Sequence, residues 1–200
     1  MYIKIDKIIE KYKISVFGVI HVGAHFGEEY LSYISAGIYN IHFFEASSRT
    51  FAKLKFQVGC SSCYNFALGA VDSISKMYVE TRNQGQSNSL LKPLLHSKQY
   101  PQITFDETEE VIVRPLDSFK VKGCNFLNID VQGFELEVLK GSEESLPDIN
   151  YIYSEVNRAE TYENCAQIGE MDGFLSRHGF KRVETIWAGG IWGDALWVKQ

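Results

Sequence analysis

V-F-G-V-I-H-V-G-A-H-F-G-E-E, residues Val16–Glu29, is the stretch of sequence that decides the fold. Its first half is apolar and rich in β-branched residues, which is typical of a strand buried on both faces. Gly23 and Gly27 then permit a tight turn that brings the backbone close to a ligand at the start of a helix. The stretch therefore predicts a strand, a glycine turn and a helix.

The next strand is expected at Ile41–Glu45, with the sequence I-H-F-F-E. It ends in an acid about twenty residues after the glycine turn, where a carboxylate can accept hydrogen bonds from both hydroxyls of a ribose. The glycines alone are also compatible with a tight turn that holds no ligand. Together with Glu45 they predict an adenosine-containing cofactor.

Length and composition place limits on the kind of protein. Two hundred residues, 45% of them hydrophobic, predict a single domain over 1–200. A net charge of −5 argues against a broad nucleic-acid surface. The chain has no apolar run of the roughly twenty residues that span a bilayer. Residues 1–14 predict an amphipathic helix without the apolar core of a signal peptide, so we expect a cytoplasmic protein.

Strands and helices alternate along the chain, which predicts a parallel sheet flanked by helices. Further strands are expected at 64–68, 75–79 (peripheral), 111–115, 126–130, 151–156, 180–187 and 194–199. Helices are expected at 48–56 with Ser48 as N-cap, at 135–140 and at 168–178. Residues 80–102 lack periodicity and are rich in amide and hydroxyl groups, so this segment is either a lid that contacts the acceptor or simply a mobile loop.

The last two strands are joined by too short a loop for a parallel crossover, so they must be antiparallel. A mostly parallel α/β sheet that ends in an antiparallel hairpin is the arrangement of the Rossmann-like class I methyltransferases. The glycine turn agrees with this, because its G-x-x-x-G spacing differs from the G-x-G-x-x-G of dinucleotide binders. A looser turn suffices for S-adenosylmethionine, which has no pyrophosphate.

Two acids end neighbouring strands and are the candidate catalytic residues. Asp130 follows the strand before Gly133, and Glu155 ends the next strand. Carboxyl ends of parallel strands face one crevice, where these groups could orient or deprotonate an acceptor hydroxyl or share a divalent ion. The alternative for Asp130 is helix capping. Glu135, in the first helical turn, suits the helix dipole whether or not it has a further role.

The remaining metal-type residues give weak signals. Cys60 and Cys63 form a lone C-x-x-C, which favours ordinary reduced thiols over a redox pair or half a zinc site. His21 and His25 lie in a strand and a turn rather than on one helix face, so no metal is predicted there. His25 is instead a candidate cofactor contact, and Trp192 a candidate for the binding site.

From about Val16 to Val198 the chain resembles the FkbM-type S-adenosylmethionine-dependent methyltransferases. The resemblance rests on five blocks in the same order and spacing, the last of them similar to the family signature D-x-x-G-x-E-x-x-V-L-x-G. The blocks are H-V-G-A-H-F-G (21–27), F-F-E-A (43–46), N-F-A-L-G (65–69), R-P-L-D-S-F (114–119) and N-I-D-V-Q-G-F-E-L-E-V-L-K-G (128–141).

The resemblance implies roles for individual residues. The turn around Gly23 and Gly27 would hold the methionine end of the cofactor, Glu45 its ribose, and Asn65 with Ala67 its adenine. The cofactor set implied in this way is His21, Gly23, Ala24, His25, Gly27, Glu45, Ala46, Asn65, Ala67 and Asp130. This chain has His21 where the family often has Asp, and Ala46 where many members have Pro.

The family is associated mainly with O-methylation, often of sugar hydroxyls. The resemblance therefore implies transfer of a methyl group from S-adenosylmethionine to a hydroxyl of a small-molecule or glycan acceptor, which Asp130 and Glu155 would face. Asp130 would take the hydroxyl proton. N-methylation on the same scaffold and a catalytically inactive adenosyl-binding module are the alternatives. The sequence names neither the acceptor nor the oligomeric state.

Overall fold

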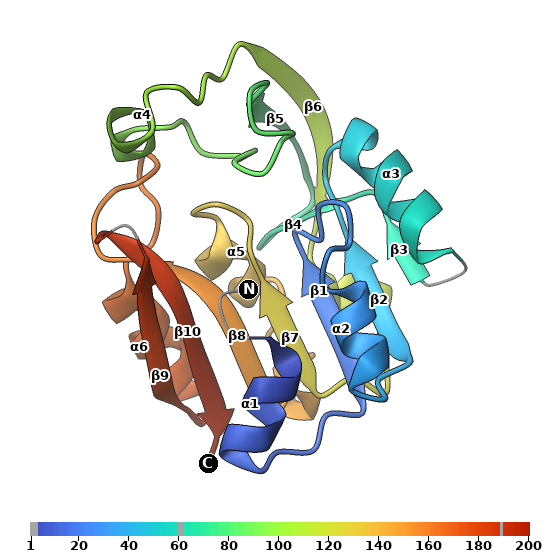
Figure 1. Ribbon diagram of the computed structural model, residues 1–200. Helices are drawn as coiled ribbons and strands as arrows, with labels where there is room; N and C mark the ends of the chain where they lie inside the picture. The colour runs from blue at the N-terminus through green and yellow to red at the C-terminus, as the bar shows by residue number, and fades with distance from the viewer. Residues whose placement is uncertain (1–3, 60–61, 189) are drawn as a thin grey trace.

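A seven-stranded sheet forms the centre of the molecule in the computed structural model, which describes residues 4–59, 62–188 and 190–200 (Figure 1). The strands are, in spatial order, β3 (Ser62–Tyr64), β2 (Asn40–Phe44), β1 (Gly18–Val22), β7 (Phe126–Ile129), β8 (Tyr151–Asn157), β10 (Trp192–Lys199) and β9 (Phe180–Ala188).

The first five strands of this order are parallel, and β10 is antiparallel to both β8 and β9. The predicted fold class, a mostly parallel sheet with a C-terminal antiparallel hairpin, is therefore confirmed. Every residue of β1 is buried, as its apolar sequence predicts for a strand covered on both faces.

Three helices cover one face of the sheet (Figure 1). They are α1 (Ile5–Tyr12), α2 (Tyr30–Ser35) and α3 (Ser48–Val58). In α1 the side chains of Ile5 and Ile8 are buried against the sheet, as the amphipathic pattern predicts. The N-cap of α3 is Ser47, whose Oγ accepts from the N–H of Thr50, so the prediction of Ser48 as cap was wrong by one residue.

The opposite face is covered by α5 (Glu135–Lys140) and α6 (Ile168–Arg177). Two 3₁₀ turns, Leu116–Phe119 and Leu146–Asp148, complete this layer. Both helices lie close to where the sequence predicts them, and the molecule is a three-layer α/β/α sandwich.

A second, three-stranded sheet lies at the upper end of the molecule in Figure 1. It consists of β4 (Ala67–Leu68), β6 (Glu107–Arg114) and β5 (Ser73–Val79), in that order. The single strand predicted at 64–68 was wrong, because the chain passes from one sheet to the other at that point. The side-chain amide of Asn65 donates to the carbonyls of Glu45 and Ala46, 2.9 Å from each, and this ends the ladder between β2 and β3.

The segment 80–102 contains a short helix, α4 (Leu95–Gln99), and an ordered turn. The buried carboxylate of Glu80 accepts hydrogen bonds from the backbone N–H groups of Arg82, Asn83 and Gly85. The segment is thus folded by its own side chains, in the manner of a compact surface loop.

Two further findings concern membrane-spanning helices and the cysteines. Among the helices of the described ranges, none has the length and apolar character that crossing a bilayer requires. Cys63, Cys124 and Cys165 are free thiols, whereas Cys60, the other half of the C-x-x-C, lies outside the described residues.

Candidate active site

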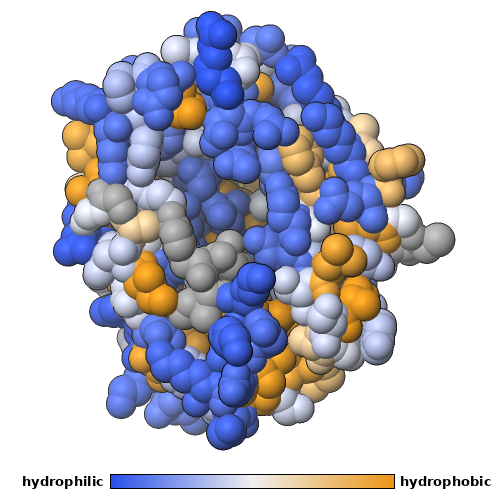
Figure 2. All heavy atoms as spheres, viewed as in Figure 1, coloured by the Kyte–Doolittle hydropathy of each residue, from blue (hydrophilic) through white to orange (hydrophobic). Residues whose placement is uncertain are grey.

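A cavity of about 580 Å³ opens at the carboxyl ends of the central strands. Figure 2 shows the corresponding hollow with hydrophilic residues around it. The strand ends supply its floor, and the 80–102 segment supplies the opposite wall. Open α/β sheets bind their ligands at this edge, so the position agrees with the prediction from sequence.

The glycine turn forms one side of this cavity. Gly23 has φ +76°, and a Cβ placed there would lie 1.8 Å from the backbone oxygen of Asp130. Only glycine fits, since both the conformation and the contact exclude a side chain. Gly23, Ala24 and His25 line the cavity.

Gly27 has a different surrounding. It also has a positive φ, +82°, but a Cβ there would meet Leu54 and Val58 of α3 at 2.8 and 2.9 Å. Gly27 is absent from the described lining of the cavity. Gly27 therefore packs closely against α3 and supports the turn without lining the cavity.

Glu45 follows the end of β2 and lies beside the glycine turn. Its two carboxylate oxygens accept from the backbone N–H groups of His25 and Ser47, each at 2.9 Å. Burial raises the pKa of this carboxyl to about 7, against the effect of the two donors. Because a carboxylate offers about four acceptor positions, two remain for the hydroxyls of a ligand.

A smaller cavity, about 60 Å³, adjoins Glu45. Ala46 and Ala67 line it, together with apolar side chains from both sheets and the turn after β7. Those apolar residues are Val22, Phe44, Phe66, Leu68, Met77, Leu90, Val131 and Phe134. Asn65 is not among its described lining residues and acts on it through the Glu45 and Ala46 carbonyls. Such a narrow apolar space suits a flat adenine ring.

His21 lines the large cavity as a neutral ring. Its Nδ1 lies 3.3 Å from the hydroxyl of Tyr33, which in turn accepts from the Asn128 side-chain amide at 2.9 Å. Burial lowers the pKa of His21 to about 4. Many members of the family that the sequence resembles have Asp at the position of His21. In this chain the carboxylates at this end of the cavity belong to Glu28 and Glu29.

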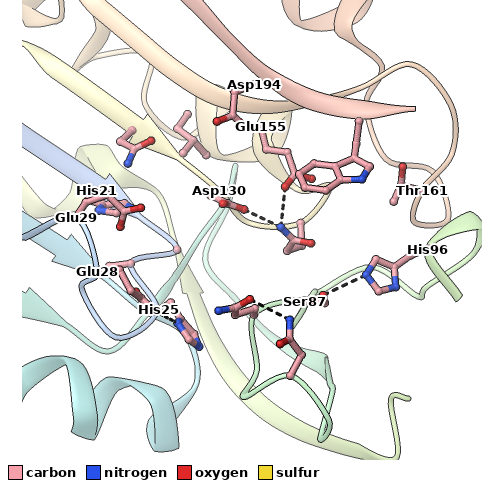
Figure 3. Close-up of a pocket in the computed structure, with 18 of the residues that line it drawn as sticks. His21, His25, Glu28, Glu29, Ser87, His96, Asp130, Glu155, Thr161 and Asp194 are labelled. Atoms are coloured by element: carbon pink, nitrogen blue, oxygen red, sulfur yellow. Dashed lines mark hydrogen bonds and ion pairs between the residues drawn. The ribbon is translucent and has the colours of Figure 1, made fainter. Parts of the chain in front are cut away.

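His25 connects the glycine turn to the 80–102 segment. Its Nδ1 lies 2.6 Å from the Glu28 carboxylate (Figure 3), and its Nε2 lies 3.0 Å from the carbonyl oxygen of Gln84. Burial disfavours the charged ring, but these two acceptors outweigh it and raise the pKa of His25 above its usual value.

Asp130 and Glu155 meet in the cavity, joined by one side chain. The Nε2 of Gln132 donates to Asp130 Oδ1 at 2.7 Å and to Glu155 Oε2 at 2.8 Å (Figure 3). Desolvation and the neighbouring carboxylates raise the pKa of Asp130, and they hold the pKa of Glu155 well above its usual range. The structure thus brings the two predicted catalytic residues together.

Glu135 serves the turn that carries these groups. One of its oxygens accepts from the backbone N–H groups of Val131 and Gly133, at 3.1 and 2.9 Å. Glu135 is absent from the described lining of the cavities, so its role here is to hold the turn in shape.

Sequence reasoning missed several lining residues. Asp194 of β10 lies opposite Glu155 in the antiparallel register and accepts from the Tyr153 hydroxyl at 2.5 Å. From the 80–102 segment, His96 lies 3.1 Å from the Ser87 hydroxyl. The predicted C-terminal hairpin pointed to the strand that carries Asp194, but the register of that strand against β8 could not be predicted from the sequence. Trp192, which the sequence suggested as a binding-site residue, does line the cavity.

A metal centre is not built among the residues that the structure describes. No group of three or more His, Cys, Asp or Glu side chains there is arranged to hold an ion. The neutral amide of Gln132 bridges Asp130 and Glu155 instead.

The residues present fit S-adenosylmethionine. The narrow apolar cavity accepts a flat base, Glu45 has acceptor positions for ribose hydroxyls, and the backbone at Gly23 stays open toward the larger cavity. The fold is that of the class I S-adenosylmethionine-dependent methyltransferases, and the site suits the cofactor of that class.

The chain belongs to the FkbM methyltransferase family. The Methyltransferase FkbM domain matches residues 21–182, which include the glycine turn, Glu45, Asp130 and Glu155.

Among curated proteins, the chain is similar to the 2-O-methyltransferase NoeI of Sinorhizobium fredii (strain NBRC 101917 / NGR234). The two are 32% identical over 81 residues, 38% of this chain and 33% of NoeI.

Two of the crystal structures that are similar in fold to this chain are those of methyltransferases. The methyltransferase FkbM from Methylobacillus flagellatus KT has a TM-score of 0.59 and 14% identity, over 93% of this chain and 45% of that one. The magnesium protoporphyrin IX methyltransferase ChlM from Synechocystis PCC 6803, with bound SAM, has a TM-score of 0.53 and 7% identity, over 96% and 74%. The matches thus span a third of NoeI and under half of the FkbM chain.

Proposed function

We propose that this protein is an O-methyltransferase that transfers the methyl group of S-adenosylmethionine to a hydroxyl of a sugar-like or other small polar acceptor. The observation that carries the proposal is the position of Asp130. Asp130 lines both the narrow cavity beside Glu45 and the large cavity, and we place it between the cofactor site and the acceptor site.

The cofactor would be held by the strand ends. Its adenine would enter the narrow apolar cavity, and Glu45 would accept hydrogen bonds from the ribose. Its methionine part would follow the backbone of Gly23–His25 into the large cavity. When bound, the cofactor supplies an electrophilic methyl group on a positively charged sulfur.

The protein's own contribution is to align the acceptor and to receive a proton. Holding an oxygen in line with the methyl group can supply up to about 7–11 kcal/mol of the barrier. The Asp130 carboxylate would take the hydroxyl proton when the bound cofactor supplies its methyl group to the acceptor oxygen. The raised pKa of Asp130 makes it a stronger base than an exposed aspartate. Glu155 lies on the other side of the Gln132 amide and would face the same acceptor.

The polar wall of the large cavity favours an acceptor rich in hydroxyl groups. The 80–102 segment contributes amide, hydroxyl and imidazole side chains, and Thr161 adds another hydroxyl. Those from the segment are Asn83, Gln86, Ser87, His96, Tyr100 and Gln102. We assign this segment the role of an acceptor-contacting lid. The name of NoeI, a 2-O-methyltransferase, supports oxygen as the methylated atom.

N-methylation on the same scaffold is the second candidate, because the carboxylates of the cavity would also attract an amine.

The three described free cysteines support a reducing compartment, and a cytoplasmic location is part of the proposal.

A screen with methyl-labelled S-adenosylmethionine tests the function. Neutral sugars, glycans and a matched set of amines are incubated with the wild type and with Asp130→Asn. We expect label on an alkali-stable ether of a hydroxylated acceptor with the wild type alone. Label on amines would replace O-methylation by N-methylation. Cofactor binding without transfer to any acceptor would favour an inactive adenosyl-binding module.

A further inference from the structure

Gln132 lies at the centre of the polar network in the large cavity. Both hydrogens of its amide are used, one toward Asp130 Oδ1 and one toward Glu155 Oε2, at 2.7 and 2.8 Å. Its Oε1 accepts from the hydroxyl of Tyr162 at 2.7 Å. Three polar groups from three different segments therefore define where this amide points.

The backbone of Gln132 is fixed as firmly as its side chain. Its φ is +55°, a left-handed conformation that costs a non-glycine residue roughly 1–2 kcal/mol. Its carbonyl oxygen accepts from the Ser89 hydroxyl at 2.7 Å, which ties the turn to the 80–102 segment. A strained residue whose side-chain amide and backbone carbonyl are both hydrogen-bonded indicates a position that the surrounding structure determines.

The amide nitrogen of Gln132 bridges the two carboxyl groups through hydrogen bonds. Two carboxylate oxygens approach this nitrogen at 2.7 and 2.8 Å, the ordinary length of an N–H···O hydrogen bond to a carboxylate. Two carboxyl groups this close repel one another unless a proton, a cation or a donor lies between them. Here a neutral donor fills that place.

We propose that Gln132 is the positioning residue of the methyl-transfer site: its amide replaces a bridging metal ion and holds the Asp130 and Glu155 carboxyl groups in one fixed arrangement. The role assigned to Asp130 rests on the proposed function. Since Oδ1 of Asp130 accepts a hydrogen bond from the Gln132 amide, Oδ2 is the oxygen that would receive the acceptor proton. Tyr162 acts one step further out, by orienting the amide that orients the carboxylates.

The proposal predicts that removing the donor creates a metal site. In Gln132→Glu a third carboxylate would stand where the amide stood, and Mn²⁺ would bind at least about tenfold more tightly than to the wild type. Free Mn²⁺ is measured by its electron paramagnetic resonance signal during titration. The matched control is Gln86→Glu, the same change in the same cavity but outside the Asp130–Glu155 bridge. It should bind Mn²⁺ no better than the wild type.

A second variant covers the case in which the added charge prevents folding. Gln132→Ala removes the donor without adding a carboxylate and should also gain Mn²⁺ affinity, by a smaller factor. Equal Mn²⁺ binding by the wild type and both folded Gln132 variants would overturn the proposal, as would an equal gain in Gln86→Glu.

Titration of the wild type with S-adenosylhomocysteine separates this inference from the proposed function. If the wild type binds the nucleoside and the Gln132 variants gain no Mn²⁺ affinity, the positioning role fails and the cofactor site stands. If the variants gain the metal but the wild type does not bind the nucleoside, the amide bridge stands and the methyl-transfer function fails.

Discussion

The carboxylate of Glu45 accepts a hydrogen bond from the backbone N–H of His25, 2.9 Å away, and this contact joins the ends of β2 and β1. It fixes the acid expected to hold the ribose against the turn expected to hold the methionine. A second donor, the N–H of Ser47, holds the other oxygen. The two halves of the proposed cofactor site are thus a single hydrogen-bonded unit.

Replacing Glu45 should weaken cofactor binding, because each hydrogen bond to its carboxylate is lost. Hydrogen bonds to a charged group contribute about 1.5–3 kcal/mol each, so Glu45→Ala should weaken S-adenosylhomocysteine binding by at least about tenfold. Calorimetry on the folded variant measures the affinity. Glu137→Ala, on α5 in an exposed pair with Lys140, is the control and should bind as the wild type does. Unchanged affinity in Glu45→Ala would remove the ribose assignment.

Gly23→Ala should destabilise the fold through a specific contact. The added methyl group would lie 1.8 Å from the Asp130 backbone oxygen, so strands β1 and β7 would have to separate at the site. Gly37→Ala is a matched control, since its φ of +80° carries the same conformational strain but no atom lies within 4 Å of the added Cβ. We expect Gly23→Ala to lose more free energy of unfolding than Gly37→Ala in urea titrations. Equal losses would show that the close contact is unimportant.

Asp130→Asn should separate cofactor binding from turnover. The amide keeps the size of the side chain but cannot take a proton, and loss of a general base costs about 10²–10⁴ in rate. S-adenosylhomocysteine affinity should stay within a few-fold of the wild type. Once an acceptor is known, kcat is the measurement, and full activity in this variant would rule out Asp130 as the base.

His25 predicts a pH dependence of stability with a definite sign. Its pKa is raised in the folded protein despite burial, because Glu28 and the Gln84 carbonyl accept from the charged ring. A raised folded pKa means that the stabilisation is fully present below the unfolded value of about 6.5 and is lost as pH rises through the folded value.

The difference in free energy of unfolding between the wild type and His25→Gln tests this, measured in urea from mildly acidic to alkaline pH. The wild type's advantage should shrink as pH rises from about 6.5 through the folded pKa. His178→Gln, at the residue that follows α6, is the control for the loss of one histidine. A difference for His25→Gln that does not change with pH would contradict the assignment of a charged, bridging ring.

Much of this site could be predicted because strand ends are local features. An apolar run followed by Gly23, and another followed by Glu45, fix two positions at the edge of a parallel sheet without knowledge of the rest. The same reasoning brought Asp130 and Glu155 together, since neighbouring parallel strands end at one edge.

The residues that escaped prediction depend on contacts between distant segments. Asp194 enters the cavity only through the register of β10 against β8, which its own sequence does not state. The strand expected at 64–68 is broken by hydrogen bonds from the Asn65 side chain to carbonyls twenty and nineteen residues earlier. The loop after Glu80 escaped prediction for a different reason: its contacts are local, but hydrogen bonds from three backbone amides to one carboxylate leave no hydrophobic periodicity in the sequence.

The central claim is that the glycine turn and Glu45 form a site for S-adenosylmethionine, and one calorimetric titration tests it most directly. The purified protein is titrated with S-adenosylhomocysteine, with NADH as the control ligand. We predict binding of S-adenosylhomocysteine in the micromolar range and none of NADH, since the turn lacks the glycine spacing that holds a pyrophosphate. Absence of S-adenosylhomocysteine binding, or equal binding of NADH, would contradict the claim.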